Sequence, residues 1–360
     1  MRLVVLGLSL SSSWGNGHAT TYRALLKAFA ARGHDVLFLE RDVPWYADNR
    51  DLPDPDFCSL QFYRDLDDLA RWTPGIARAD AVIVGSYVPD GVAVGRLAQR
   101  VATGTTAFYD IDTPVTLAKL ERGDFEYLQP DLIRGYDVYL SFTGGPTLRH
   151  IQEAYGSPAA RALYCSVDPD SYRPTGAAQR WDLSYLGTYS DDRQPTLTRL
   201  LVDAARAAPG KRFVVAGPQY PAGIDWPANV ERIEHLPPAE HAGFYSASRW
   251  TLNVTRADMI ARGWSPSVRL FEAAACATPI LSDRWQGLDS LFTPGCEIVL
   301  ADSVADVLAA LDREDAATIG EAGRARVLAE HTADHRAAEL EAYLRKAAHA
   351  RPRRAMSGAA

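Results

Sequence analysis

The stretch that decides the fold is residues 2–39, RLVVLGLSLSSSWGNGHATTYRALLKAFAARGHDVLFL. Its first part, residues 2–8, is an apolar run rich in β-branched side chains, which predicts a strand. Apolar residues at helical spacing follow over 22–31, Gly33 ends that helix, and residues 35–39 predict a second strand. A strand, glycine-rich loop, helix and strand with the two strands parallel is how a nucleotide-binding α/β domain begins.

The same pattern continues along the chain and restarts in its second half. With 360 residues the chain exceeds what one hydrophobic core usually serves, so two domains are expected. A stretch rich in proline and turn formers, residues 166–174, suits an exposed connection between them. Further strands are predicted at 81–85, 105–109, 138–142, 183–186, 213–216, 230–233, 251–254 and 279–282, and further helices at 196–208, 267–276, 303–311, 316–330 and 335–348.

We therefore expect an α/β protein with two Rossmann-like domains. The first covers residues 1–165 and the second covers 166–334. A C-terminal helix, 335–349, is expected to pack back on the first domain, and residues 350–360 are expected to form a flexible tail.

Composition and charge exclude several classes of protein. The chain is 47% hydrophobic and 23% charged with a formal net charge of −7, and no basic stripe interrupts the folded part, so nucleic acid is not an expected partner. The apolar run after Met1 is too short for a signal peptide or a membrane span, which predicts a cytoplasmic protein without a transmembrane segment. The four cysteines form no C-x-x-C pair and no cluster with histidine at metal-ligand spacing, so no metal site is expected there.

The stretch richest in chemistry is residues 263–279, GWSPSVRLFEAAACATP. Ser265 is the expected N-cap of a helix with Pro266 at its first position, so that exposed backbone N–H groups could bind a diphosphate. Arg269 lies in the first turn, and Glu272 follows on the same side of the helix, where a carboxylate could accept both ribose hydroxyls. The alternative is a capped amphipathic helix with an Arg–Glu pair on its surface.

This segment resembles the donor-site helix of group 1 (family 4-like) GT-B glycosyltransferases, especially the CgeB-like (spore maturation protein-like) branch, with the form S-x-R-x-F-E-A-A-A-C-G-T-P. The resemblance implies two Rossmann-like domains that face each other across a cleft. It implies that Glu272 binds the donor ribose and that Arg269 is the preceding arginine of the motif.

Other segments follow the order of the same family. VDPDSYRP at 167–174 resembles its V-D-x-x-x-F-x-P connector, and LGTYSDDR at 186–193 resembles its first strand and loop, where a basic residue contacts the diphosphate; here that residue is Arg193. Residues 213–218 and 229–233 also match in order. The residues expected to bind the donor are Glu272, Arg269, Arg193, Ser267, Val268, Gly187, Thr188, Gly217 and Pro218.

Two positions depart from the family pattern. The pattern has two glutamates separated by seven residues, and counting back from Glu272 puts Trp264 at the first. This leaves open whether the anomeric configuration is retained. Ala277 stands where glycine is usual, so the helix end either avoids a left-handed backbone or tolerates strain there.

The N-terminal loop, Gly15, Asn16, Gly17 and His18, opens a helix after a strand, where backbone can approach an anion closely. We expect it on the acceptor side, with His18 as a candidate base for an acceptor hydroxyl or as a simple helix cap. The loop is not a full G-x-G-x-x-G motif. Glu40 nevertheless ends the next strand, where a dinucleotide-binding fold keeps its ribose acid, so a nicotinamide cofactor is a weaker alternative.

Asp110 and Asp112 resemble a D-x-D metal signature, but they follow a strand of a Rossmann-like half and lack further ligands. Contact with the acceptor or support of the loop is the preferred interpretation, and no metal is expected. Large aromatic residues such as Trp45, Trp181 and Tyr185 are expected in the core or at interfaces.

The sequence thus predicts a metal-independent glycosyltransferase without a cofactor. It would use a nucleotide-sugar donor and a small-molecule, glycan or protein acceptor. A nucleotide-sugar-modifying enzyme such as a 2-epimerase and a non-catalytic sugar-nucleotide-binding protein are the alternatives, because fold alone does not fix the chemistry.

Overall fold

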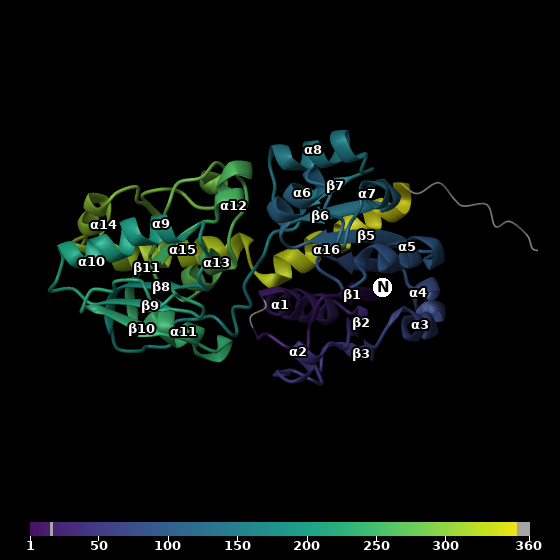
Figure 1. Cartoon of the computed structure of the whole chain (residues 1–360), viewed down its shortest axis with the longest axis horizontal. Helices are drawn as coiled ribbons and strands as arrows, with labels where there is room; N and C mark the ends of the chain where they lie inside the picture. The colour runs from purple at the N-terminus through teal and green to yellow at the C-terminus, as the bar shows by residue number, and fades with distance from the viewer. Residues whose placement is uncertain (15–16, 351–360) are drawn as a thin grey trace, which may run out of the picture. The chain divides into compact units, whose positions relative to one another are not determined.

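The computed structural model describes residues 1–14 and 17–350, which form two compact units (Figure 1). Unit 1 comprises residues 1–164 and the chain from Ala333 onward, and unit 2 comprises residues 165–332. Each unit contains one parallel sheet whose strand order reverses in the middle. The α/β class predicted from the sequence is confirmed.

Unit 1 contains a seven-stranded sheet in the order β3-β2-β1-β4-β5-β6-β7. Its central strands are continuous apolar runs because helices cover both faces of a parallel sheet, and residues 3–6 and 81–85 are accordingly buried. The strands are β1 (Arg2–Gly7), β2 (Asp35–Arg41), β3 (Ser59–Tyr63), β4 (Ala81–Gly85), β5 (Thr105–Asp110), β6 (Val138–Ser141) and β7 (Ala160–Ala162). The helices are α1 (Gly17–Ala31), α2 (Pro44–Ala47), α3 (Leu66–Leu69), α4 (Thr73–Arg78), α5 (Gly91–Val101), α6 (Thr113–Glu121), α7 (Pro130–Gly135), α8 (Pro146–Tyr155) and α16 (Ala333–Ala350).

The last helix of the described chain, α16, packs against α1 and β5 of unit 1 and is drawn in yellow in Figure 1. Leu340 and Leu344 are fully buried in this contact. Glu341 joins α16 to the turn that follows α1, because its carboxylate lies 2.7 Å from the Arg32 guanidinium and 3.3 Å from Nε2 of His34. Nearby positive and polar groups hold the pKa of Glu341 at about 2, with the hydrogen bonds from Arg32 and Arg345 as the main causes.

Unit 2 contains a six-stranded sheet in the order β10-β9-β8-β11-β12-β13. The predicted helix over 196–208 is interrupted, because residues Thr198–Val202 form a π-helical turn between two short α-helices. The strands are β8 (Trp181–Leu186), β9 (Phe213–Ala216), β10 (Val230–Ile233), β11 (Ser248–Asn253), β12 (Ile280–Ser282) and β13 (Val299–Leu300). The helices are α9 (Gln194–Leu197), α10 (Asp203–Ala207), α11 (Pro238–Ser246), α12 (Ala257–Arg262), α13 (Val268–Ala275), α14 (Val304–Leu311) and α15 (Ala316–Glu330).

Two expectations about side-chain burial are only partly met. Trp181 and Tyr185 are buried as expected, but Trp45 is 62% exposed because the short helix α2 lies outside the sheet layers. The connection 166–174 is not uniformly exposed either: Val167 pairs with Thr332 in an isolated bridge, and Tyr172 is buried. These residues tie the connection to unit 2.

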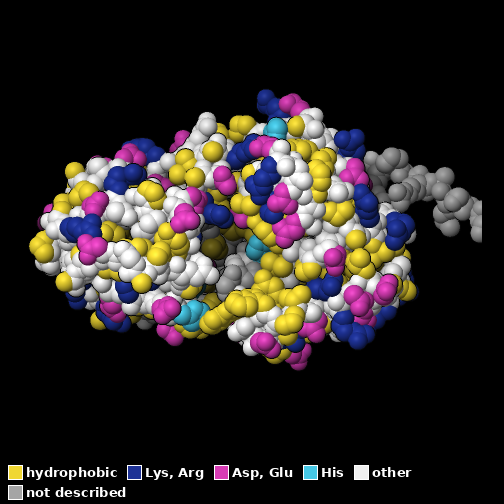
Figure 2. Space-filling model, in the orientation of Figure 1, with side chains coloured by type: hydrophobic (Ala, Val, Ile, Leu, Met, Phe, Trp, Pro, Cys, Tyr) yellow, Lys and Arg dark blue, Asp and Glu magenta, His cyan; other side chains and the backbone are white. Residues whose placement is uncertain are grey.

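The described surface gives two further observations. Acidic and basic side chains are interspersed over the face drawn in Figure 2, so this face carries no stripe of a single sign. None of the helices within 1–14 and 17–350 combines the length and the apolar composition that crossing a membrane requires.

Candidate functional site

The strand order of unit 2 reverses between β8 and β11, which pair in parallel. In open α/β sheets, ligands bind outside the carboxyl ends of the strands at such a switch point, because the connections leave in opposite directions and open a crevice. β8 ends at Leu186, and β11 ends at Asn253. Among the predicted donor residues, Gly187, Thr188 and Arg193 follow β8, Ser267, Val268, Arg269 and Glu272 follow β11 at the start of α13 and within it, and Gly217 and Pro218 follow β9.

Arg269 bridges the two strand ends of the switch point. Its Nε donates to the Leu186 carbonyl, and its Nη1 donates to Oδ1 of Asn253 at 3.1 Å. The guanidinium carbon lies 4.9 Å from the centre of the Tyr185 ring, and the residue is 8% exposed. The cation is therefore fixed in place by contacts that do not neutralise its charge.

The helix that carries Arg269 starts two residues later than the sequence suggested. Ser267, rather than Ser265, is the N-cap of α13, which begins at Val268. The Ser267 hydroxyl donates to Oδ1 of Asn253 at 2.8 Å instead of capping the helix, and the Pro266 carbonyl accepts from the Cys165 thiol. The prediction of Ser265 was wrong because tertiary contacts hold residues 265–267 extended, and the first-turn N–H groups now belong to Val268 and its successors.

The other end of α13 answers the question raised by Ala277. This residue adopts the left-handed conformation with φ +56°. The Thr278 N–H bonds to the Ala273 carbonyl at 3.1 Å, as in a helix that ends through a left-handed residue. The helix end therefore tolerates strain at an alanine where glycine would have none.

The second predicted arginine, Arg193, lies at the start of α9 and donates through Nη2 to the Thr188 carbonyl at 2.6 Å. Burial lowers its pKa, and the positive charges of Arg269 and Arg256 act in the same direction, against an opposing effect of Tyr185. Asp192 lies 3.8 Å from Arg256 and offsets part of that charge. Three cations, Arg193, Arg256 and Arg269, thus lie close enough to affect one another, an arrangement suited to an anion.

The glycines of the two loops allow backbone to approach backbone. Gly217 has φ +138°, and a Cβ on it would lie 2.1 Å from the Gly187 carbonyl oxygen. The Pro218 carbonyl accepts the N–H of Tyr189 at 3.0 Å. The loops after β8 and β9 are therefore locked together, with the predicted residues Gly187, Thr188, Gly217 and Pro218 side by side.

Glu272 lies in a buried polar cluster that the sequence did not reveal. The Tyr245 hydroxyl donates to its Oε2 at 3.4 Å, and Nδ1 of His241 lies 4.0 Å from the same oxygen. Nδ1 of His241 in turn lies 3.2 Å from the Tyr172 hydroxyl. Glu272 is 4% exposed and its contacts differ from those of Arg269, so the alternative of an Arg–Glu pair on the surface is wrong.

Trp264, at the position of the family's first glutamate, is held in an unusual backbone conformation with φ +42°. Its N–H donates to the Gln286 carbonyl at 2.6 Å. A Cβ on Gly287 would lie 2.4 Å from the indole ring, so the ring packs directly on the backbone there. Left-handed conformations of bulky residues are costly and persist where surrounding structure fixes them.

In unit 1, Glu40 is fully buried and supports the N-terminal loop. Its Oε2 accepts the N–H groups of Leu10 at 2.6 Å and Ser11 at 2.9 Å, and its Oε1 accepts the hydroxyls of Ser9 and Ser11. The carboxylate is therefore committed to the loop, which argues against the nicotinamide alternative, since a ribose acid must be accessible.

The remaining predicted residues of unit 1 lie at the ends of β5 and α1. Asp110 is fully buried; its oxygens accept the hydroxyls of Thr116, at 2.7 Å, and Tyr139, and burial raises its pKa to about 6. Asp112 precedes α6 and accepts the Tyr87 hydroxyl at 3.1 Å.

His18 lies in the first turn of α1, directly after Gly17, and packs edge-on against Tyr87 with ring centroids 5.4 Å apart. Burial lowers its pKa to about 4. Gly15 and Asn16 lie outside the described residues. Across 1–14 and 17–350, no group of three or more histidine, cysteine or carboxylate side chains is arranged to hold a metal ion.

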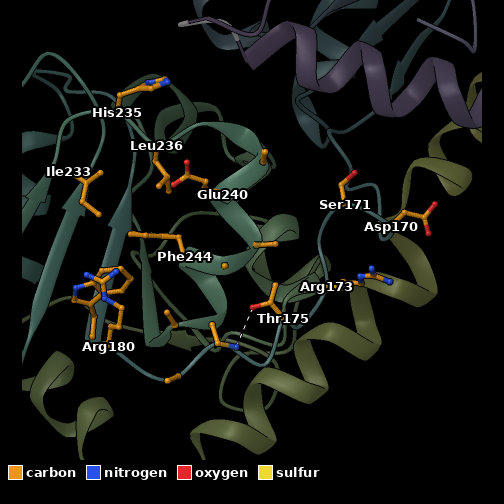
Figure 3. Close-up of a pocket in the computed structure, with 17 residues that line it drawn as sticks. Asp170, Ser171, Arg173, Thr175, Arg180, Ile233, His235, Leu236, Glu240 and Phe244 are labelled. Atoms are coloured by element: carbon orange, nitrogen blue, oxygen red, sulfur yellow. Dashed lines mark hydrogen bonds between the residues drawn. The ribbon is translucent and has the colours of Figure 1, made fainter. Parts of the chain in front are cut away.

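A separate groove of about 790 Å³ opens in unit 2 between residues 170–180, the end of β10 and α11 (Figure 3). Ile233, Leu236 and Phe244 supply apolar lining, and Glu240 and His235 lie at its border. None of the predicted donor residues lines it. α11 separates the two regions, because His241 and Tyr245 on this helix lie near Glu272 instead.

Comparisons with known proteins agree with this geometry. A protein-family model described as "glycosyl transferase-like" matches residues 193–342, which include Arg193, Arg269 and Glu272. No curated protein matches the chain by sequence.

Solved structures with the same fold cover nearly the whole chain. A structure of HepE from Anabaena in complex with UDP and glucose has a TM-score of 0.71 at 13% identity, covering 96% of this chain and 100% of that chain. Sucrose-phosphate synthase from Thermosynechococcus elongatus has 0.66 at 15%, covering 96% and 99%. The α,α-trehalose 6-phosphate synthase from Burkholderia multivorans has 0.61 at 13%, covering 97% and 99%. The chain has the GT-B fold of glycosyltransferases, and residues 193–342 match a glycosyl transferase-like family.

Proposed function

We propose that the chain is a glycosyltransferase that moves a hexosyl group from a nucleoside-diphosphate sugar to an acceptor hydroxyl without a metal ion. The observation that carries this proposal is the pair of arginines at the switch point of unit 2, buried Arg269 and half-buried Arg193. The family match over residues 193–342 supports it, because it spans both arginines and Glu272.

In this proposal the two arginines bind the diphosphate and stabilise the negative charge that develops as it leaves the sugar. Their cations take the part that a divalent ion plays elsewhere. The N–H groups of Ser267 and Val268, together with the loops of Gly187, Thr188, Gly217 and Pro218, line the same position. Glu272 accepts hydrogen bonds from the ribose hydroxyls; its contact with Tyr245, at 3.4 Å, is long enough to be exchanged for a shorter one.

The acceptor side is proposed to lie on unit 1. With its pKa lowered to about 4, His18 is neutral near pH 7, which is the state in which a ring nitrogen can accept a proton from a hydroxyl. Asp112 and Gly17 would contact the acceptor. Asp110, which is fully buried, would hold the loop through Thr116 and Tyr139.

The first test is binding of UDP, GDP, ADP and dTDP, measured by thermal unfolding and calorimetry. UDP comes first because HepE was solved with UDP and with UDP-glucose. We expect a base-selective rise in Tm for the wild type that Glu272→Ala abolishes, since a ligand that binds only the folded state stabilises it. Glu321→Ala, on the exposed side of α15, is the matched control and should respond like the wild type.

Failure of all four nucleotides to shift the Tm of folded wild-type protein would refute the proposed donor site. If a donor is found, transfer should continue in EDTA. Incubating donor without acceptor separates the alternatives: only an epimerase changes the nucleotide-sugar itself. Tight binding without turnover would indicate a non-catalytic protein. Trp264 motivates this alternative because it stands at the position of the family's first glutamate.

A further inference from the structure

Tyr185 lies on β8 at the centre of unit 2 and is fully buried. Its hydroxyl has no hydrogen-bond partner within residues 1–14 and 17–350. A buried donor without a partner lowers the stability of the folded state, so such groups are uncommon in folded proteins. The surroundings of the Tyr185 hydroxyl indicate why it is retained.

The hydroxyl is aimed at the same place as the unused nitrogen of Arg269. A Cβ built on Gly187 would lie 2.8 Å from the Tyr185 hydroxyl and 2.7 Å from Nη2 of Arg269. The two donors therefore converge beside Gly187, and the missing side chain of the glycine leaves room for both. The Arg269 guanidinium lies over the Tyr185 ring at 4.9 Å, which keeps the pair together.

A third donor lies nearby. Nε of Arg193 is also buried without a partner in the described chain, and the charge of Arg193 interacts with both Tyr185 and Arg269. The loop they surround is fixed, because the Tyr220 hydroxyl donates to the Gly187 carbonyl at 3.0 Å. All three groups can donate a hydrogen bond and neither arginine can accept one, so a ligand that satisfies all three must be an acceptor, and the two cations favour a negatively charged one.

Tyr136 in unit 1 also has a buried hydroxyl without a partner in the described chain, and its surroundings differ from those of Tyr185. The hydroxyl lies beside Gly95 and the methyl carbons of Leu132, and burial alone raises its pKa. This hydroxyl is packed against apolar atoms and does not indicate a ligand site. The Tyr185 hydroxyl instead faces an arginine at the switch point of its sheet.

We propose that Tyr185 is a further donor-binding residue, whose hydroxyl donates a hydrogen bond to a diphosphate oxygen beside Nη2 of Arg269. This inference deepens the proposed function and rests on it for the identity of the ligand. The hydroxyl adds a neutral hydrogen-bond donor to the two arginines. Its directional hydrogen bond would orient the diphosphate that the arginines attract by charge.

The test is calorimetric titration of the wild type and Tyr185→Phe with UDP and with inorganic pyrophosphate. The substitution removes one oxygen from a buried ring and keeps its shape. We expect about tenfold weaker binding of both ligands, since a hydrogen bond to a charged group contributes at least that factor. Tyr136→Phe, which removes an equally buried hydroxyl outside the site, should bind both ligands as the wild type does.

The possible outcomes separate this inference from the proposed function. Equal affinities of the wild type and Tyr185→Phe for UDP overturn the role of Tyr185 and leave the proposed function standing. Tyr185-dependent binding of pyrophosphate without binding of any nucleotide supports an anion site and overturns the proposed function. Binding of neither ligand by folded wild-type protein overturns both. A change in Tm alone, with unchanged affinities, shows a purely structural hydroxyl.

Discussion

Each unit reverses its strand order once, but the two units differ in the charged groups near that reversal. In unit 2, buried Arg269 and half-buried Arg193 lie near donors that have no partner in the described chain. In unit 1, the reversal lies between β1 and β4; Asp110 ends the neighbouring strand β5, and Asp112 follows it. Their oxygens accept hydrogen bonds from Thr116, Tyr139 and Tyr87. The same topology therefore carries cations at the reversal of unit 2 and carboxylates one strand away from the reversal of unit 1.

The units also differ in whether the groups at these positions have hydrogen-bond partners within the described chain. Both carboxylate oxygens of Asp110 accept hydrogen bonds from side chains of its own unit. In unit 2, carbonyl and amide oxygens orient Arg269, while the Tyr185 hydroxyl beside it has no partner in the described chain. An anion would complete unit 2, and the following substitutions test this contrast in order of expected effect.

Removing the central cation should have the largest effect. Arg269→Ala should weaken binding of a nucleoside diphosphate about 1,000-fold, as truncation of a buried, hydrogen-bonded charge does. Arg269→Lys keeps the charge but loses the fork that spans Leu186 and Asn253, so it should recover only part of the affinity. Calorimetry measures both, with Arg206→Ala on the exposed side of α10 as the control. If Arg269→Ala binds the nucleoside diphosphate as tightly as the wild type does, Arg269 is not part of an anion site in unit 2.

In unit 1 the test is pH. The pKa of Asp110 rises from 3.8 unfolded to about 6 folded because of burial, so the folded state binds the extra proton between these values. Its contribution to the free energy of unfolding is therefore present at low pH and falls by about 3 kcal/mol as pH rises from about 4 to 6. Asp110→Asn should remove that slope in denaturant unfolding.

His18 gives the opposite sign in the same unit. Its pKa is lowered to about 4 on folding, so its contribution is fully present above pH 6.5 and is lost as pH falls toward 4. His18→Gln should therefore make stability less sensitive to acid, whereas Asp110→Asn removes a loss that occurs on raising the pH. Identical pH profiles of both variants and the wild type would contradict the burial of these groups.

A smaller effect is expected at Gly187. The added methyl group of Gly187→Ala would meet Nη2 of Arg269 and the Tyr185 hydroxyl at under 3 Å, so both donors must shift. We expect about tenfold weaker nucleotide binding, as for the loss of one charged hydrogen bond. Gly210→Ala, where a Cβ would meet nothing within 4 Å, is the matched control. Equal affinities for the two variants would show that the donors do not converge there.

The smallest effect should be a gain in stability at Ala277. Because this residue has φ +56°, Ala277→Gly should raise the free energy of unfolding by about 0.5–1 kcal/mol. Ala275→Gly, within α13, should lower it by a similar amount through lost helix propensity. Denaturant unfolding measures both, and two changes of the same sign would count against a left-handed conformation at Ala277.

The sequence predicted strands best where a short apolar run was enough to identify them. β4 and β9 occur at the predicted residues, because strands of a covered parallel sheet form short, bounded apolar runs. β10 also occurs at the predicted residues, although only its first residue is buried. β3 was not predicted, since its burial alternates and turn formers precede it. β13, with two residues, is too short to leave a pattern.

Local spacing predicted only those residues of the candidate site that share one helix; Arg193 and the glycine loops were predicted from the family resemblance. Arg269 and Glu272 follow from spacing within α13. Asn253, Tyr172 and His241 come to the site from distant segments, and no local pattern marks them. Tyr185 was predicted as a core residue, and its ring is one; the direction of its hydroxyl depends on Gly187 and Arg269, which only the folded chain brings together.

Because α16 belongs to unit 1, unit 1 cannot be completed during synthesis until unit 2 has been made. The helix that completes unit 1 is encoded after the whole of unit 2, and Thr105 of β5 contacts the Leu344 carbonyl, more than two hundred residues later, at 3.4 Å. A ribosome therefore releases all of unit 2 before unit 1 can cover the apolar faces of α1 and β5. Until then, the first unit, although it is synthesised first, lacks the helix that packs on α1 and β5.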